Sequence, residues 1–338
     1  MRATHRIAAA LAALATAAAL AACGGDDDTT AATAPDPGAA FPVTIEHKFG
    51  TTEIPAEPKR VVTVGYTEQD IVLALGVKHV AEREFLGGYA WKERPWAQAA
   101  LGGHEPEIVG AEEINFEAVA AQRPDLIIAT HSGITEGDYQ RLSKIAPTIA
   151  QSDDYVDFGM PWQEQTRMIG RALGREQEAE QVIADVEAKF AQAREEHPEF
   201  AGKTAILAYG GPDGYGAYAT EDTRSRFFAD LGFAIPERID ELAGESFYAE
   251  FSQEQIRLMD QDVVVLYGKP EDVLDNPVFK RLDAVREGRV IYFDATDQFA
   301  GALGFSSPLS LAWLLDEAVP KLAAAVDGDP ETEVEQPE

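Results

Sequence analysis

The sequence INFEAV at residues 114–119, followed by DLII at 125–128, has a counterpart later in the chain, FSQEQI at 251–256 followed by DVVV at 262–265. In both copies the same number of residues separates the glutamate from the aspartate. Each copy is typical of a short helix opened by an Asn or Ser cap, and then of a continuous apolar strand buried on both faces. The repeat therefore predicts two lobes of one α/β design, each with a parallel sheet.

Helix and strand patterns alternate in the rest of both halves as well. Buried strands are predicted at residues 60–65, 204–208 and 290–293, and helices ended by a glycine at 68–75 and 224–231. Residues 43–54 are typical of a hairpin that turns at Phe49-Gly50. This alternation predicts two open, Rossmann-like α/β lobes.

One long helix is predicted between the two halves. Residues 176–196 contain no Gly or Pro, and Val182, Ile183, Val186 and Phe190 recur at helical spacing. Such a helix is ~30 Å long, and His197-Pro198 ends it. We therefore expect a first lobe at 41–160, bridging helices at 161–200 and a second lobe at 201–326, with small closure motions between rigidly joined lobes.

The N-terminal residues have the pattern of a signal peptide. Arginines within residues 1–6 precede an apolar run at 7–22, which is shorter than the ~20 residues of a membrane-spanning helix. Cys23 is the only cysteine of the chain, so no intrachain disulfide can form. The segment 20–23 resembles the lipobox of bacterial lipoproteins, which predicts lipidation of Cys23; an ordinary signal peptide with a chance cysteine is the alternative.

Two polar segments flank the predicted lobes. Residues 24–40 lack apolar periodicity and are predicted to form a flexible tether, and the acidic residues 327–338 are expected to be disordered. The 338-residue length corresponds to about two domains. The formal net charge of -31 argues against binding to nucleic acid or to an anionic bilayer through surface charge.

Several motifs in a fixed order carry a family resemblance. They are IPAEPKRVV at 54–62, ALGV at 74–77, NFE at 115–117 with PDLI at 124–127, and GFSSPLS at 304–310. With the lipobox and the long helix, they resemble the iron-siderophore substrate-binding lipoproteins of bacterial ABC importers, over about residues 41–325. The resemblance implies a monomeric, lipid-anchored protein on the extracytoplasmic side of the cell membrane. It would carry a ferric siderophore to an ABC permease and need no cofactor.

The same resemblance implies that Glu117 and Glu254, one in each lobe, dock onto arginines of the permease. The alternative is that each glutamate only stabilises the first turn of its helix, by ~0.3–1 kcal/mol.

The ligand is expected between the lobes, against loops at the carboxyl ends of the strands. These loops are rich in aromatic residues and arginines, which suit a ferric chelate with an apolar rim and negatively charged oxygens. The candidate ligand-binding residues are Tyr66, Tyr89, Trp91, Arg94, Trp96, Tyr215, Tyr218, Arg224, Arg226, Tyr248, Phe299 and Phe305.

Two features leave the chemistry of the ligand open. An arginine at a helix start opposes the helix dipole, so Arg224 and Arg226 either meet a bound anion or pair with Glu221, Asp222 or Asp230. Hydroxamate binders of the resembled family place an arginine just before the NFE segment, where this chain has Ala-Glu-Glu at 111–113. This departure argues against a hydroxamate-specific site, and the class of siderophore stays open.

Other functions are less compatible with the sequence. The chain has no GxGxxG after the first strand, no Walker loop and no GxSxG, so an enzyme is disfavoured. A direct metal-ion site needs several converging nitrogen ligands, and only His131 lies in a predicted binding loop. Binders of cobalamin or haem with the same fold stay open as alternatives.

Overall fold

The computed structural model describes residues 41–337 apart from 86–89, 213, 328 and 330. The predicted signal peptide, Cys23, the tether and Tyr89 therefore lie outside the described residues. Among the residues that are described, no helix is both long and apolar enough to cross a membrane.

The first lobe contains the predicted parallel sheet. Its strand order is β5-β4-β3-β6-β7, and every neighbouring pair is parallel. The two central strands are buried throughout, as their continuous apolar sequence predicts. The strands are β3 (Val61–Thr63), β4 (Ala81–Glu82), β5 (Glu107–Ile108), β6 (Leu126–Ala129) and β7 (Thr148–Ala150).

Short helices and one hairpin surround this sheet. The hairpin of β1 (Val43–His47) and β2 (Gly50–Ile54) is antiparallel as predicted, and it turns at Lys48-Phe49, one residue earlier than expected. The helices are α1 (Glu68–Ala74), η1 (Trp91–Glu93), η2 (Pro95–Ala97), α2 (Gln98–Leu101), α3 (Phe116–Ala121) and α4 (Glu136–Leu142).

The sheet of the second lobe is mixed rather than wholly parallel. Its order is β10-β9-β8-β11-β12, and only β8, β11 and β12 run parallel to one another. The connection from β8 to β9 is too short for a crossover, so β9 returns antiparallel. The strands are β8 (Ala205–Gly211), β9 (Gly214–Tyr218), β10 (Tyr248–Phe251), β11 (Val263–Tyr267) and β12 (Val290–Phe293).

The helices of the second lobe are short. They are α7 (Thr223–Asp230), α8 (Glu237–Ala243), η4 (Gln255–Met259), α9 (Pro270–Val273), η5 (Phe279–Arg281) and α10 (Asp283–Arg286).

The repeated aspartates do the same work in both lobes. Asp125 accepts hydrogen bonds from the N–H groups of Lys59 and Arg60 at 2.8 Å, just before β3. Asp262 accepts the N–H of Thr204 at 2.8 Å, just before β8. Each carboxylate thereby holds the start of the neighbouring central strand, which gives the repeat a structural reason.

The helix before the second aspartate differs from the prediction. Asn115 caps α3 by accepting the Ala118 N–H at 3.0 Å. In the second copy the helix is the 3₁₀ helix η4. The expected cap by a serine side chain is absent there. The side chain of Gln255 accepts the N–H of Ser252 at 2.9 Å instead, so the serine hydroxyl is not the cap.

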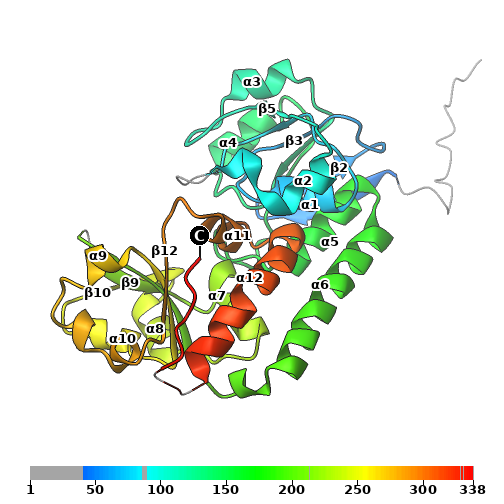
Figure 1. Ribbon diagram of the computed structural model, residues 1–338. Coiled ribbons are helices and arrows are strands. Elements are labelled where there is room, and N and C mark those ends of the chain that lie inside the picture. The colour runs from blue at the N-terminus through cyan, green and yellow to red at the C-terminus, as the bar shows by residue number, and fades with distance from the viewer. Residues whose placement is uncertain (1–40, 86–89, 213, 328, 330, 338) are drawn as a thin grey trace, which may run out of the picture. The chain divides into compact units, whose positions relative to one another are not determined.

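Bridging helices connect the lobes, and Figure 1 shows α6 and α12 side by side. The helix α6 has the predicted bounds, and its residues Ile183, Val186 and Phe190 are buried. The serine Ser307 caps α12, with Ser310 completing a capping box. The bridging elements are α5 (Trp162–Leu173), α6 (Glu176–Glu196), η3 (Pro198–Phe200), α11 (Gln298–Phe305) and α12 (Pro308–Val326).

The described residues of the acidic tail pack on the second lobe, which differs from the expected disorder. Val334 is 7% exposed and belongs to the hydrophobic core. The side-chain oxygen of Gln336 accepts the N–H of Tyr292 in β12 at 2.6 Å. One apolar and one amide side chain thus anchor a segment whose composition alone predicted no structure.

Candidate functional site

Aromatic rings form a continuous series from the first lobe to the second. In the first lobe, Phe85 and Tyr66 follow β4 and β3, and their ring centroids are 6.4 Å apart. Phe158, in the connection to α5, is 6.4 Å from Tyr66 on one side and 6.4 Å from Phe247 of the second lobe on the other. We call the whole set the aromatic series: Phe85, Tyr66, Phe158, Phe247, Tyr248, Tyr209 and Tyr218.

The second lobe continues the series along its antiparallel strands. Tyr248 is 5.1 Å from Phe247 and 6.4 Å from Tyr209, which is 5.8 Å from Tyr218. All seven residues of the series are half-buried. The predicted residues Tyr66, Tyr218 and Tyr248 are therefore brought together, and Phe158 and Tyr209 join them without having been predicted.

Phe158 is held by an unusual backbone. Its φ of 64° lies in the left-handed region, which residues other than glycine rarely adopt. Gly133 makes room for the ring, since a Cβ there would lie 2.6 Å from it. The ring also packs edge-on against His131 at 5.1 Å. Backbone strain of this kind is concentrated at functional sites. The strained conformation lets the Phe158 ring contact rings of both lobes.

A buried glutamate fixes the loop that carries Tyr66. Glu68 accepts the N–H of His131 at 2.7 Å and that of Thr67 at 3.2 Å, which joins the loops after β3 and β6. A side chain at Gly65 would overlap this carboxylate, so the glycine is required by the close approach. Burial raises the pKa of Glu68, and these N–H groups oppose the rise.

Arg224 is paired within the protein. Its Nε and Nη2 donate to the two carboxylate oxygens of Asp222 at 2.8 and 2.6 Å, and its guanidinium lies 3.8 Å from the ring centroid of Tyr218. Of the two alternatives for Arg224, the salt bridge is therefore present, with Asp222 as partner. Arg226 donates to the carbonyl of Gly159 at 2.7 Å, beside Phe158.

Arg83 is a further arginine beside the aromatic series that the sequence did not reveal, and it is 5% exposed. Its guanidinium lies 4.2 Å from the ring centroid of Tyr66 and donates to the carbonyls of Ala111 and Glu112. The segment before NFE lacks an arginine of its own. It is contacted instead by Arg83, which follows β4. The rule that selected Tyr66, a position after a buried strand, could also have selected Arg83.

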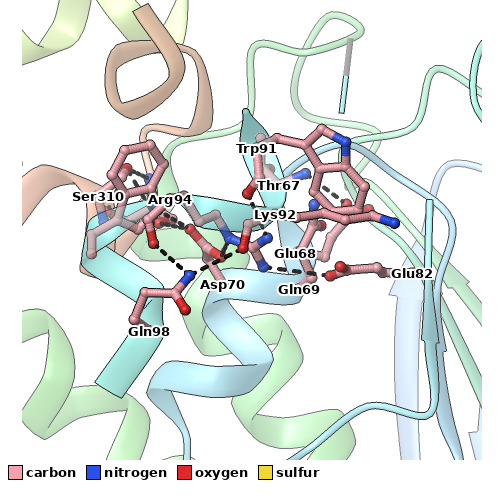
Figure 2. A network of polar contacts seen from close by, with 12 residues as sticks. Thr67, Glu68, Gln69, Asp70, Glu82, Trp91, Lys92, Arg94, Gln98 and Ser310 are labelled. Atoms are coloured by element: carbon pink, nitrogen blue, oxygen red, sulfur yellow. Dashed lines mark hydrogen bonds and ion pairs between the residues drawn. The ribbon is translucent and has the colours of Figure 1, made fainter. Parts of the chain in front are cut away.

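Arg94 and Trp96 were predicted to contact the ligand, but both bond to Asp70 in a buried polar network, in which Figure 2 shows Arg94 beside Asp70. The Nε of Arg94 donates to Asp70 at 2.9 Å, and the indole N–H of Trp96 donates to the other oxygen of Asp70 at 2.6 Å. Arg94 is 1% exposed and Trp96 is 8% exposed. Both side chains are therefore buried and bonded within the protein. The prediction that they contact the ligand was wrong.

The network reaches from the first lobe to a bridging helix. The hydroxyl of Ser307, which caps α12, donates to Asp70 at 3.2 Å. Glu82 receives a second contact from Arg94, at 3.4 Å, and is 2.9 Å from the Nε2 of His79. Burial raises the pKa of Asp70, and Arg94 and Trp96 oppose the rise. The network ties α1 and η2 to the start of α12.

Four further predicted aromatic residues are core residues or lie outside the described chain. Trp91 is 5% exposed, and its indole N–H donates to Glu84 at 3.3 Å. Tyr215 and Phe299 are buried against Phe279 and Phe293, on faces of their elements that point into the core. Tyr89 lies outside the described residues. Aromatic density in a loop does not show which way each ring points.

Phe305 is also buried, but it supports the aromatic series. It is 2% exposed, and its ring stacks on Phe85 with centroids 4.6 Å apart. Its ring also contacts that of Trp96, with centroids 5.8 Å apart. The buried network and the aromatic series are thus connected through one phenylalanine.

Glu117 and Glu254 occupy comparable positions in the two lobes. Glu117 lies in the first turn of α3, and Glu254 immediately precedes η4. Both are exposed, and within the described part of the chain neither side chain has a hydrogen bond or ion pair. They lie in the segments that lead into β6 and β11, the matching central strands.

His131 is the histidine closest to this site. It is 7% exposed, and burial lowers its pKa to about 4, so it is neutral at neutral pH. Within the described ranges, no three His, Cys, Asp or Glu side chains are grouped to hold a metal ion. What the described residues offer a ligand is ring surface, tyrosine hydroxyls and guanidinium groups.

The sequence and the fold match a known class of protein. Residues 61–296 match the family model of the periplasmic binding proteins, and the chain belongs to this family. It is 27% identical over 263 residues to the probable siderophore-binding lipoprotein YfiY of Bacillus subtilis (strain 168), which covers 72% of this chain and 78% of the relative.

Two solved structures have the same fold. A periplasmic solute binding protein from Mycobacterium smegmatis str. MC2 155 is 34% identical, with a TM-score of 0.74 over 86% of this chain and 100% of that one. PiaA of Streptococcus pneumoniae TIGR4, in complex with ferrichrome, is 28% identical, with a TM-score of 0.75 over 85% of this chain and 99% of that one.

Proposed function

We propose that this protein captures a ferric siderophore between its two lobes and delivers it to an ABC permease for iron uptake. The observation that carries the proposal is the aromatic series, in which Phe158 contacts rings of both lobes. The relatives named for binding a siderophore or ferrichrome support it. The iron arrives as part of the cargo, and the protein itself holds no cofactor and performs no catalysis.

The residues of the series suit such a cargo. A ferric siderophore presents an apolar outer rim, which half-buried rings cover, and chelating oxygens, which neutral hydroxyls and guanidinium groups can contact. The hydroxyls of Tyr66, Tyr209, Tyr218 and Tyr248 have no hydrogen-bond partner among the described residues. They therefore remain able to donate to ligand oxygens.

Delivery requires a contact with the permease, and we propose that Glu117 and Glu254 provide it. Both carboxylates are exposed and lie in matching segments of the two lobes. Charges that lose water in a docked interface can couple by about 1.5 kcal/mol or more, whereas exposed pairs are worth ~0.2–1 kcal/mol. The pair would thus matter only in the complex.

We also propose that Cys23 carries a lipid anchor after removal of residues 1–22, and that residues 24–40 tether the monomeric protein to the extracytoplasmic face of the cell membrane. The motif at residues 20–23 supports the anchor, and the relative YfiY is named a lipoprotein. Cys23→Ser should release the protein from membranes or leave it unprocessed, because lipidation requires the sulfur. Membrane attachment of the unmodified protein with no lipid in its mass, or normal processing and membrane retention of Cys23→Ser, would contradict the anchor.

Ligand binding is tested by titrating the tryptophan fluorescence of the purified protein. The panel contains ferric trihydroxamates, ferric tricatecholates, haem and cobalamin, with the iron-free siderophores as controls. Saturable quenching by a ferric siderophore, and weaker or absent quenching by its iron-free form, is the expected result. Saturation by haem or cobalamin alone would replace the proposed ligand by one of those cofactors.

A further inference from the structure

The arginines along the aromatic series are all accompanied by carboxylates. Arg224 has the shortest contact, a two-point ion pair with Asp222 at 2.8 and 2.6 Å. Asp222 is 3% exposed and also caps α7 by accepting the Arg224 N–H at 2.9 Å. Its position is therefore fixed by the helix, and it neutralises the guanidinium that lies over Tyr218.

Arg83 in the first lobe is compensated more indirectly. Its guanidinium is satisfied by backbone carbonyls, and the buried Glu68 interacts with it electrostatically. Arg83 also lines a cavity of about 400 Å³, whose walls include Glu112 and Glu113. The positive charge over Tyr66 is thus met mainly by carbonyl oxygens, and within the described part of the chain it has no side-chain ion pair.

Arg226 completes the set. Its guanidinium bonds to the carbonyl beside Phe158, and the carboxylates of Glu221, Asp222 and Asp230 interact with it electrostatically. His131, packed on Phe158, is neutral at neutral pH. Along the series, Arg224 is therefore neutralised by a direct ion pair before any ligand arrives, whereas Arg83 and Arg226 bond to backbone carbonyls and have carboxylates in their surroundings.

Charge balance decides which ferric complex such a site accepts. Three hydroxamates neutralise Fe³⁺, whereas three catecholates leave a trianion. A trianion that loses water against the rings needs positive charge that is not already neutralised, because desolvation of an uncompensated charge costs several kcal/mol. A neutral complex needs only ring surface and hydroxyl donors, and Tyr66, Tyr209, Tyr218 and Tyr248 supply both.

We infer that Asp222 is a specificity-determining residue: by neutralising Arg224, it makes the site favour ferric complexes of no net charge, such as ferric trihydroxamates, over trianionic ferric tricatecholates. This inference rests on the proposed function. It differs from the expectation that the missing arginine before the NFE segment disfavours hydroxamates, because a neutral complex needs no positive charge at that segment.

The first test compares the dissociation constants of ferrichrome, a neutral trihydroxamate, and ferric enterobactin, a trianionic tricatecholate. The unmodified protein should bind ferrichrome at least about tenfold more tightly. This measurement requires no variant. If both complexes bind but the trianion binds as tightly or more tightly, the inference is wrong while the proposed function stands. If no ferric complex binds, the proposed function itself fails.

The second test changes only the charge. Asp222→Asn keeps a good helix cap and removes the negative charge from Arg224. The preference for ferrichrome should fall by about tenfold or more, mainly through tighter binding of ferric enterobactin, and the effect should shrink at high salt. The double variant Asp222→Asn with Arg224→Gln restores neutrality and should restore the preference.

Asp283→Asn is the matched control. Asp283 pairs with Arg286 at 3.0 Å on α10 of the same lobe, and both side chains are exposed. The control removes the same negative charge as Asp222→Asn, but at a position away from the aromatic series. It should leave the preference for ferrichrome unchanged. An equal shift in both variants, or no shift in Asp222→Asn, overturns the role of Asp222.

Discussion

Two arginine–aspartate pairs in this protein lie in different surroundings. Arg94 donates to Asp70 at 2.9 Å, and both side chains are at most 1% exposed. Arg224 donates to Asp222 at 2.6 Å, but 21% of its side chain is exposed. The first pair is further bonded to Trp96 and Ser307, whereas the second lies against Tyr218 of the aromatic series.

The difference shows what distinguishes a structural ion pair from one beside a ligand. The oxygens of Asp70 have partners from η2 and from α12, so the pair holds elements of the fold together. The pair of Arg224 leaves ring and guanidinium surface open beside half-buried tyrosines. The sequence does not show which of Arg94 and Arg224 is structural, because both lie among aromatic and acidic residues.

The largest expected effect concerns the buried pair. Asp70→Ala leaves Arg94 uncompensated in the interior and should lower the free energy of unfolding by roughly 3–5 kcal/mol. Urea unfolding measures the loss. Asp283→Ala breaks an exposed pair and should cost no more than about 1 kcal/mol. Similar losses in both variants would mean that the network does not stabilise the connection of α1 and η2 to α12.

The next effect concerns pH near the second pair. Because burial lowers the pKa of His131 from 6.5 to about 4, the unfolded chain binds a proton between these values and the folded one does not. The contribution of His131 to the free energy of unfolding is therefore highest above pH 6.5. It falls as the pH falls toward 4, by about 3 kcal/mol at most, because the unfolded chain gains a proton on His131 first. His131→Gln should make unfolding less sensitive to pH in this window. An unchanged pH profile would show that His131 is not desolvated beside Phe158.

A smaller effect is expected in ligand binding. Tyr248→Ala removes a half-buried ring of the aromatic series and should weaken ferric siderophore binding by about 1–3 kcal/mol, with little change in stability. Calorimetric titration measures the loss. Tyr292→Ala is the control, because Tyr292 is a half-buried tyrosine on β12, at the opposite edge of the same sheet. Equal losses from both variants would place the ligand elsewhere.

The smallest effect in purified protein is expected at the exposed glutamates. Glu117→Gln with Glu254→Gln should change the free energy of unfolding by less than about 0.5 kcal/mol and leave ligand affinity unchanged. Uptake of iron-loaded siderophore by cells should nevertheless fall, and more than with either single change. Normal uptake by the double variant would refute the docking role, since neither carboxylate belongs to the aromatic series.

Much of the fold could be predicted because periodicity reports burial. The bounds of α6 and the repeat before β6 and β11 follow from local apolar patterns, and the repeated aspartates hold matching strands. The antiparallel edge of the second sheet was missed, because strand direction depends on the length of a connection and not on the pattern inside the strands.

The candidate site was predicted less well, because it depends on the direction of individual side chains. Tyr66 and Tyr248 face the series, but Trp96 turns toward Asp70 and Tyr215 into the core. Phe158 depends on a left-handed backbone and on the small Gly133. Neither condition has a sequence pattern of its own, so only the folded chain reveals this ring.

The central claim, that a ferric siderophore lies against the aromatic series, is tested most directly by paramagnetic broadening. Protein labelled with 3-fluorotyrosine is titrated with the ferric complex and, as the diamagnetic reference, with the gallium complex of the same siderophore. The account predicts that Fe³⁺ broadens the fluorine signals of Tyr66, Tyr209, Tyr218 and Tyr248 most and that of Tyr292 least. Stronger broadening of Tyr292, or equal broadening of all these signals, would contradict it.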